Sequence, residues 1–367
     1  MSGPLDGLRV VEMAGLGPTP HSCMVLTDLG ADVVQIRRPA GRGAPDGVVD
    51  ADSGLWRGRR IVEANLKDPD TIDTVRKIVV QADVLVEGFR PGVMERVGLG
   101  PDTCLELAPH LVYARMTGWG QGGQFQHAAG HDINYLAVTG ILSAMGPAGE
   151  PPIPPLSLVG DFGGGSMFLV VGVLAALLER QRSGRGQVID AAMTDGAAIL
   201  AQLQWSWKAA GRWVSREDGN LLDGSAPFYC TYGCTDGYMA VGALEDVFWH
   251  NLVEVLGLED LPNRWDRSHW PDLRAAIAAR FATKSRAEWE EAFDGVDACV
   301  TAVLDFDEAP AHPYAVERGS YVRVSGEIQP NVAPRFSRSV PNNPAAHQSA
   351  ALGSVLEGWL PGRGDGV

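Results

Sequence analysis

Apolar and polar positions alternate along the first 200 residues in a way that predicts strands and helices in turn. Residues 8–13 form an apolar run typical of a buried strand, residues 21–30 carry a helical pattern, and residues 32–36 form a second apolar run. A loop rich in Gly and Pro, residues 14–20, joins the first strand to the helix. The three elements predict a βαβ unit with two parallel strands and a right-handed crossover.

The alternation continues and predicts an open α/β layer fold. The next elements are a helix at 70–81, strands at 83–87 and 111–116, and long helices at 166–182 and 195–211. The second of these long helices carries two tryptophans and is expected to bridge to another region.

The pattern changes after about residue 225, which predicts a second domain. Strands near 227–232 and 238–243 precede helices near 247–256 and 271–282, and Ser285 with Glu288 forms a capping box for the next helix. A Pro-rich segment and a short helix near 346–359 follow. We expect four parts: a large domain at 1–195, a linker helix at 196–224, a small α/β domain at 225–325, and a C-terminal segment at 326–367 that returns to the large domain.

Charge and cysteine content narrow the class of protein. The 367 residues carry a formal net charge of −15, which argues against a nucleic-acid binder but leaves room for one phosphorylated small molecule in an arginine pocket. Five cysteines are few and odd in number, so we expect a reducing, cytoplasmic compartment. Cys230 and Cys234 have no second metal-ligand pair at zinc spacing and are interpreted as free core thiols. No signal peptide is visible, and the apolar run 167–178 is too short for a membrane span, which predicts a buried helix.

Arginines gather where the predicted strands end. Gly15 and Gly17 begin a dinucleotide-like turn, but Pro20 replaces its third glycine, and Arg37-Arg38 stands where a NAD site needs a carboxylate. Guanidinium groups suit a phosphate, either the 2′-phosphate of NADP or a phosphate of another nucleotide such as coenzyme A. Two solvated surface arginines are the alternative. Further arginines in the same kind of position, which favour an anion pocket, are Arg57, Arg59, Arg60, Arg90 and Arg96.

Two glycine-flanked segments carry candidate proton-transfer groups. His131, in Gly130–Tyr135, precedes a helix-like run at 132–142 whose first amides suit a developing oxyanion. Asp161, in Gly160–Gly165, is either an N-cap or an acid/base, and its three following glycines are interpreted as allowing a ligand close to the backbone. Glu245 follows a strand of the second region and is either a support for an imidazole or the N-cap or a first-turn residue of the next helix.

Several longer motifs make the chain resemble the α-methylacyl-CoA racemases, members of the class III CoA-transferase (CaiB/BaiF-like) superfamily. The resemblance covers almost the whole chain. The segments that carry it are 5–12, 29–34, 38–39, 82–92, 118–121, 130–135, 160–161 and 186–190.

The resemblance implies a Rossmann-like large domain with an open parallel sheet, a smaller α/β domain, and an interlocked homodimer. It implies that His131, supported by Glu245, is one acid/base and Asp161 the other, with the amide of Asp132 holding the thioester oxygen. The substrate would be an acyl-CoA, with no metal and no separate cofactor. The positions that match the CoA site of the family are Arg38, Leu55, Trp56, Arg57, Gly58, Arg60, Gly88, Arg90, Arg96, Gly130 and Tyr135.

The same resemblance leaves two activities to weigh. A racemase would interconvert (2R)- and (2S)-2-methylacyl-CoA by 1,1-proton transfer, whereas a class III CoA-transferase would use Asp161 as a nucleophile. The transferases typically have tyrosine-led sequence at the place of His131-Asp132, and the oxalate-handling members have a glycine-rich loop where this chain has Glu245, so both departures favour the racemase. Gly88, where many relatives have asparagine, is expected to alter a CoA contact and not the chemistry.

Overall fold

A computed structural model describes residues 3–39 and 54–360, which divide into two compact units. The first unit comprises 1–139, 155–201 and 313–367, and the second comprises 140–154 and 202–312. The segment 140–154, assigned to the large domain from the sequence, clusters with the second unit, and 313–325 clusters with the first. Each unit is described below by itself.

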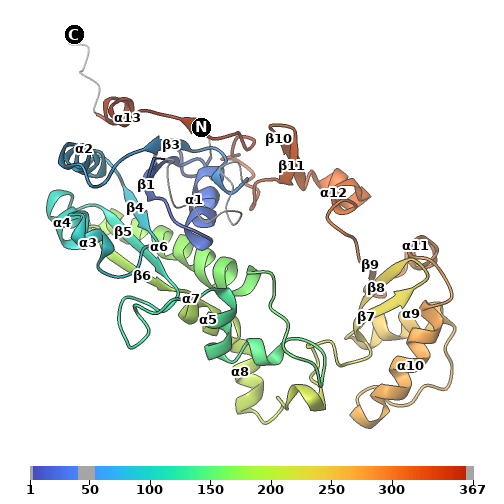
Figure 1. Ribbon diagram of the computed structural model, residues 1–367. Coiled ribbons are helices and arrows are strands. Elements are labelled where there is room, and N and C mark those ends of the chain that lie inside the picture. The colour runs from blue at the N-terminus through green and yellow to red at the C-terminus, as the bar shows by residue number, and fades with distance from the viewer. Residues whose placement is uncertain (1–2, 40–53, 361–367) are drawn as a thin grey trace. The chain divides into compact units, whose positions relative to one another are not determined.

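The first unit is built on one seven-stranded sheet in which every neighbouring pair is parallel. Its strand order is β12-β3-β2-β1-β4-β5-β6 (Figure 1). This arrangement confirms the expected Rossmann-like open α/β fold, because the sheet grows outward in both directions from its first strand. The strands are β1 (Arg9–Met13), β2 (Asp32–Arg37), β3 (Arg60–Glu63), β4 (Val84–Glu87), β5 (Val112–Thr117), β6 (Val188–Ala192) and β12 (Gln348–Ser349).

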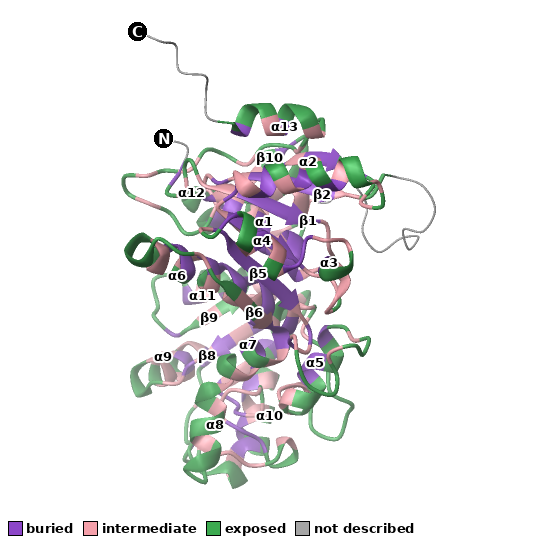
Figure 2. Cartoon of the chain, turned by 90° about the vertical axis from the view of Figure 1, so that its left-hand side faces the viewer, coloured by how far each residue is buried: buried purple, intermediate pink, exposed green. Residues whose placement is uncertain are grey.

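Helices cover both faces of this sheet because its central strands are apolar on both sides. Val11 and Met13 of β1 join one core with α2, α3, α4 and α13, whereas Val10 joins another with α1, α5 and α6. The central strands are accordingly buried throughout (Figure 2). The helices are α1 (Pro18–Asp28), α2 (Pro69–Val80), α3 (Val93–Arg96), α4 (Pro101–Leu107), α5 (Asp132–Thr139), α6 (Phe168–Ser183), α7 (Met193–Leu200), α12 (Pro313–Arg318) and α13 (Leu352–Trp359).

The C-terminal elements β12 and α13 bind to the first three strands of the sheet. β12 adds a strand beside β3, and the indole nitrogen of Trp359 on α13 donates to Asp32 at 2.7 Å. The backbone oxygen of Trp359 accepts from Arg9 at 2.7 Å. Between α12 and β12, β10 (Tyr321–Val324) and β11 (Glu327–Pro330) form an antiparallel hairpin.

The second unit is a small α/β domain with an antiparallel sheet, ordered β7-β8-β9. Its core packs that sheet against Leu252, Ile277 and Trp289 from three helices. The predicted capping box is present, since Ser285 and Glu288 each accept from the other's backbone amide. Its main elements are β7 (Tyr229–Cys234), β8 (Gly237–Gly242), β9 (Val300–Ala302), α8 (Gln202–Ala209), α9 (Asp246–Leu256), α10 (Trp270–Phe281) and α11 (Arg286–Phe293).

Two long helices differ from their predictions. The helix predicted at 195–211 is two helices, α7 and α8, because Ala201 leaves helical geometry at φ −87°, ψ 15°. The helix predicted at 166–182 starts earlier, with a π-helical segment, η3 (Leu158–Met167), that runs directly into α6.

The apolar run 167–178 is predicted to form a buried helix, and that prediction is wrong for the outer face of α6. Leu169, Val170 and Val173 pack in the sheet core, but Val171 and Leu178 are 59% and 64% exposed. By length and apolar composition, Leu158–Ser183 is the one helix among the described residues that could cross a membrane. A single such helix is weak evidence for a span, because a core helix of a soluble protein has the same properties.

Candidate active site

The strand order reverses between β1 and β4, where α/β sheets of this type bind ligands at the carboxyl ends of their strands. The first turn of α1 and the loop after β4 touch there. A Cβ on Gly88 would collide with the hydroxyl of Thr19, and Thr19 is itself buried. The close approach of Gly88 to Thr19 therefore leaves no room for a larger residue at position 88 while Thr19 keeps its place.

The start of α1 is poorly equipped to bind a pyrophosphate. Gly17 precedes the helix at φ 59°, but Pro18 and Pro20 have no backbone N–H, and the amide of His21 donates to Gly17. Dinucleotide sites depend on several free amides at this helix start. The geometry therefore disfavours the dinucleotide alternative and agrees with the missing third glycine.

Asp161 lies inside the π-helical segment η3, in its first turn, so the N-cap interpretation is wrong. Its amide donates to the Asp132 carboxylate at 2.8 Å, and its own carboxylate faces Gly17, whose Cβ position would lie 3.2 Å from Oδ2. Burial raises the pKa of Asp161 to about 6, with a further rise from the Asp132 charge and an opposing effect of His131. π-Helical turns are rare and frequently mark functional sites.

Two of the three glycines after Asp161 have a packing role that the sequence analysis did not predict. A Cβ on Gly164 would lie 2.6 Å from the backbone nitrogen of Ala197, and one on Gly165 would lie 2.8 Å from Met193 Cγ. Both glycines are buried against α7. They permit close packing of η3 on α7. The approach of a ligand to the backbone of this segment remains a prediction.

His131 directly precedes α5 and is exposed. Its amide donates to the side chain of Asn134 at 3.1 Å, and its carbonyl accepts from the amides of Asn134 and Tyr135. The amide of Asp132, the first residue of α5, has no acceptor within the described residues. A free amide at a helix start, next to an exposed imidazole, is suited to an oxyanion.

Tyr135 and Gly130 fix the turn in front of His131. The Tyr135 hydroxyl donates to the Gly130 carbonyl at 2.5 Å, and Trp119 packs edge-on against the Tyr135 ring with centroids 4.8 Å apart. Burial raises the pKa of Tyr135, the charge of Asp161 raises it further, and Arg90 opposes the effect. These interactions bring the predicted residues His131, Asp132, Tyr135 and Asp161 into one site, with Arg90 close enough to act on its electrostatics.

Sequence reasoning missed His21, which binds the segment carrying Asp161. Its Nδ1 lies 2.7 Å from the Ser166 hydroxyl, and its ring stacks on Phe162 with centroids 4.5 Å apart. Burial lowers the pKa of His21, as do the nearby cations Arg57 and Arg59. The available sequence signal was a histidine one helical turn after the Gly17 loop.

Glu245 lies in the second unit, at the N-cap position of α9, and is exposed. Its side chain makes no capping hydrogen bond. Glu245 therefore has the expected position of a helix cap, but its side chain does not make the hydrogen bond of one. Support of the His131 imidazole by Glu245 remains a prediction.

Two arginines expected to bind CoA are instead engaged by the protein. Arg57 is buried and bonds both oxygens of Asp28, at 3.0 and 2.5 Å, and the Pro330 carbonyl at 2.7 Å. Arg60 pairs with Asp32 at 2.6 Å and lies over the Trp359 ring. Arg57 therefore joins β11 to α1, and Arg60 packs on α13 from the sheet. A direct contact of either arginine with CoA remains a prediction.

Three further residues predicted for the CoA site, Leu55, Trp56 and Gly58, are neighbours of Arg57 and Arg60 in the sequence. Leu55 and Trp56 lie half-buried in the short 3₁₀ helix η1 (Gly54–Trp56), and the Gly58 amide donates to the Ala345 carbonyl at 2.6 Å. Arg59, which was grouped with the anion pocket, is fully buried and pairs with Glu12 at 2.8 Å.

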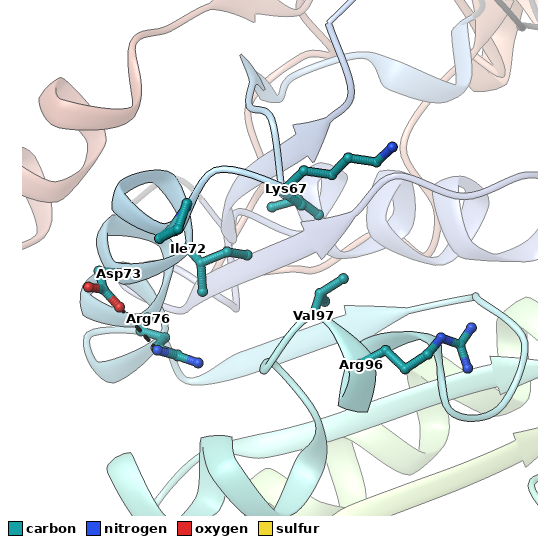
Figure 3. A pocket seen from close by; sticks show the side chains of 8 residues that line it. Lys67, Ile72, Asp73, Arg76, Arg96 and Val97 are labelled. Carbon is teal, nitrogen blue, oxygen red and sulfur yellow. Dashed lines mark hydrogen bonds and ion pairs between the residues drawn. The ribbon is translucent and has the colours of Figure 1, made fainter.

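Arg38, Arg90 and Arg96 are exposed, and all three follow or lie near strand ends of the sheet. Arg96, on α3, lines a cleft of about 460 Å³ whose opposite side carries Lys67, on the loop after β3 (Figure 3). Arg76 also lines the cleft but is paired with Asp73 at 3.0 Å. Lys67 is a second cation that the sequence analysis did not single out.

Comparison with known proteins places these features in a family. The family model for CoA-transferase family III matches residues 5–351. α-Methylacyl-CoA racemase of Mus musculus is 46% identical over 95% of this chain and 90% of its own length, and that of Homo sapiens is 45% identical over 93% and 87%. Acetyl-CoA:oxalate CoA-transferase of Acetobacter aceti is 31% identical over 89% of this chain and 88% of its own length.

Solved structures agree with this assignment. A CAIB/BAIF family protein from Brucella suis superposes with a TM-score of 0.81 at 25% identity, over 93% of this chain and 95% of that one. The protein Rv3272 from Mycobacterium tuberculosis superposes with a TM-score of 0.79 at 28% identity, over 96% of this chain and 99% of that one. The chain belongs to CoA-transferase family III.

Proposed function

We propose that this chain is an isomerase that interconverts (2R)- and (2S)-2-methylacyl-CoA thioesters by 1,1-proton transfer through an enolate. The observation that carries the proposal is the pair of proton-transfer groups, His131 and Asp161, which interact electrostatically beside the free amide of Asp132. The 45–46% identity to proteins named α-methylacyl-CoA racemase supports the same activity.

In the proposed mechanism, one of His131 and Asp161 removes the α-proton and the other returns a proton to the opposite face. Two groups are needed because a single base would usually return the proton to the face from which it came. The thioester oxygen gains negative charge in the enolate and accepts a hydrogen bond from the Asp132 amide. A donor of this kind is worth about 3–4 kcal/mol in comparable acyl chemistry.

The electrostatics of Asp161 suit proton transfer. A pKa of about 6 means that the carboxyl group is readily protonated and deprotonated near neutral pH, which suits a general acid/base. The same carboxyl group is mostly ionised at neutral pH, so its pKa is also compatible with a nucleophile. The alternative is a CoA-transferase with Asp161 as the nucleophile, as the similarity to transferases at 30–31% identity also allows.

The nucleotide part of CoA is proposed to bind along the carboxyl ends of the strands. Arg38, Arg90 and Arg96 offer exposed guanidinium groups there, and the cleft between Lys67 and Arg96 adds a second cationic side chain to Arg96. Phosphate groups bind such cations through charge-assisted hydrogen bonds. The reaction as proposed uses no metal and no cofactor apart from the CoA of the substrate.

We also propose a cytoplasmic homodimer. Apolar side chains on the outer faces of α6 and α7 support a partner surface, since Val171, Leu178 and Ile199 are each more than half exposed. Clustered exposed apolar residues commonly mark protein–protein contacts. Light scattering coupled to size-exclusion chromatography measures the mass that tests this proposal.

Solvent isotope exchange tests the proposed reaction. In D₂O, either enantiomer of a 2-methylacyl-CoA is expected to gain deuterium at C2 as it racemises, and His131→Ala should lose nearly all turnover. Exchange of CoA between carboxylic acids without deuterium uptake would contradict the racemase. Hydroxylamine trapping of an acyl group on Asp161 would support the transferase instead.

A further inference from the structure

The carboxylate of Asp132 is bound on one side only. Its Oδ1 accepts the amide of Asp161 at 2.8 Å, whereas Oδ2 is buried and has no hydrogen-bond donor within the described residues. The residue as a whole is 5% exposed. A buried charged oxygen without a hydrogen-bond donor destabilises the fold, so this arrangement calls for an explanation.

Gly160 makes this position of the carboxylate possible. A Cβ on Gly160 would collide with Oδ1 of Asp132 and would lie 3.0 Å from its Cγ. Gly160 is buried, and its backbone φ is not in the left-handed region. The absence of a side chain at 160 therefore serves the approach of Asp132 to η3, and not an unusual turn of the backbone.

We propose that Asp132 acts through its carboxylate as a positioning residue for Asp161, holding the backbone of η3 and directing an uncompensated negative charge at the Asp161 carboxyl group. This inference rests on the proposed function, in which Asp161 moves a proton. It is separate from the role of the Asp132 backbone amide, because a change of side chain leaves that amide in place.

The groups around Asp161 show why Asp132 has this effect. Within the part of the chain that the structure describes, no cation binds Asp132, so its charge is not neutralised locally and it opposes ionisation of Asp161. His131 acts in the opposite direction, and Tyr135 lies within electrostatic range. The titratable or charged residues on the elements packed against η3 are His21, Cys23 and Asp28 of α1, His131, Asp132 and Tyr135 at α5, Glu179, Arg180 and Arg182 of α6, Asp195 of α7, Tyr113 and Arg115 of β5 and Asp190 of β6.

The negative charge of Asp132 helps Asp161 both to take up and to release a proton, as the two directions of the reaction require. One enantiomer requires ionised Asp161 with protonated His131, and the other requires protonated Asp161 with neutral His131. Both states hold one proton between the two groups, so both enantiomers follow the same apparent pKa values of the pair. On the acidic side activity falls because the pair takes up its second proton and no base remains.

The test compares Asp132→Asn with Asp132→Ala in the full chain. Asparagine keeps an oxygen that accepts the Asp161 amide but removes the charge, so the acidic limb of kcat/KM should move to lower pH by about one unit for both enantiomers. Its plateau kcat should fall less than that of Asp132→Ala, because the acceptor for the Asp161 amide is kept. Alanine also removes the acceptor, and its plateau kcat should fall at least about tenfold, as should that of Gly160→Ala.

Asp102→Asn is the matched control, because it removes one exposed carboxylate from a different helix, α4. The acidic limb of its kcat/KM profile should stay at the wild-type pH. An unchanged limb in Asp132→Asn overturns the inference if wild type takes up deuterium at C2. Absence of deuterium uptake in wild type overturns the proposed function instead. Should the variants fail to fold, ¹³C NMR of wild-type carboxyl groups decides: Asp132 must be charged while Asp161 titrates, and a protonated Asp132 in that range overturns the inference.

Discussion

The Cα of Gly164 lies so close to α7 that a Cβ there would sit 2.6 Å from the backbone nitrogen of Ala197. The reverse also holds, because a Cβ on Gly196 would collide with the carbonyl oxygen of Gly164. The π-helical segment and α7 therefore touch backbone to backbone through two glycines. This contact helps to fix the turn that carries Asp161, three residues before Gly164.

Gly164→Ala is expected to lower the free energy of unfolding by about 1–3 kcal/mol, because the added methyl group must push two helices apart. Chemical denaturation followed by circular dichroism measures the change. Gly122→Ala is the control, since a Cβ at that glycine meets nothing within 4 Å. Equal free energies of unfolding for the two variants would show that η3 and α7 move apart without loss of stability.

His21→Phe is expected to keep the stacking on Phe162 but to lose the hydrogen bond with Ser166. We expect kcat to fall several-fold because the segment bearing Asp161 loses an anchor, and Ser166→Ala should have a similar effect. The double variant should be no worse than either single one, since both remove the same bond. A double-mutant cycle on kcat measures the coupling, and additive losses would argue against a shared role.

Asp161→Asn is expected to abolish turnover and to stabilise the fold above the pKa of Asp161. The folded state raises this pKa from 3.8 to about 6, so folding takes up a proton between these values and wild-type stability falls as pH rises through that window. Asparagine removes this loss, which amounts to about 1–2 kcal/mol at pH 8 after allowance for solvent screening. Unfolding at pH 8 and well below pH 4 measures the difference, which should be absent at the lower pH; a gain of equal size at both would contradict the explanation.

Arg57→Met and Arg96→Met are expected to separate a structural arginine from a CoA-binding one. Arg57→Met leaves Asp28 buried without its partner, so the free energy of unfolding should fall by about 3 kcal/mol. Arg96→Met should leave stability unchanged and raise KM for the acyl-CoA about tenfold at similar kcat, because it removes binding common to ground and transition states. Steady-state kinetics and denaturation on both variants check the assignment, and a normal KM in Arg96→Met would remove it from the site.

Much of the fold could be predicted from local pattern. The strands at β1, β2, β4 and β5 lie within one residue of their predicted bounds, because a strand buried on both faces is an uninterrupted apolar run. β6 has an exposed, mixed pattern, and β12 has only two residues, so neither gives such a run. Their places in the sheet depend on pairing with strands that are distant in the sequence.

The sequence by itself determined the chemical types at the site: an imidazole and a carboxylate beside glycines, with arginines after the strands. Only the tertiary structure decided what each group is bonded to. Arg57 and Arg96 look alike in the sequence, yet Arg57 is paired with Asp28, whereas Arg96 lines a cleft. Asp161 resembled a helix cap, yet it lies in a π-helical turn, where burial and a neighbouring carboxylate raise its pKa. Charge, burial and hydrogen-bond partners arise from segments far apart in the chain, and local pattern does not contain them.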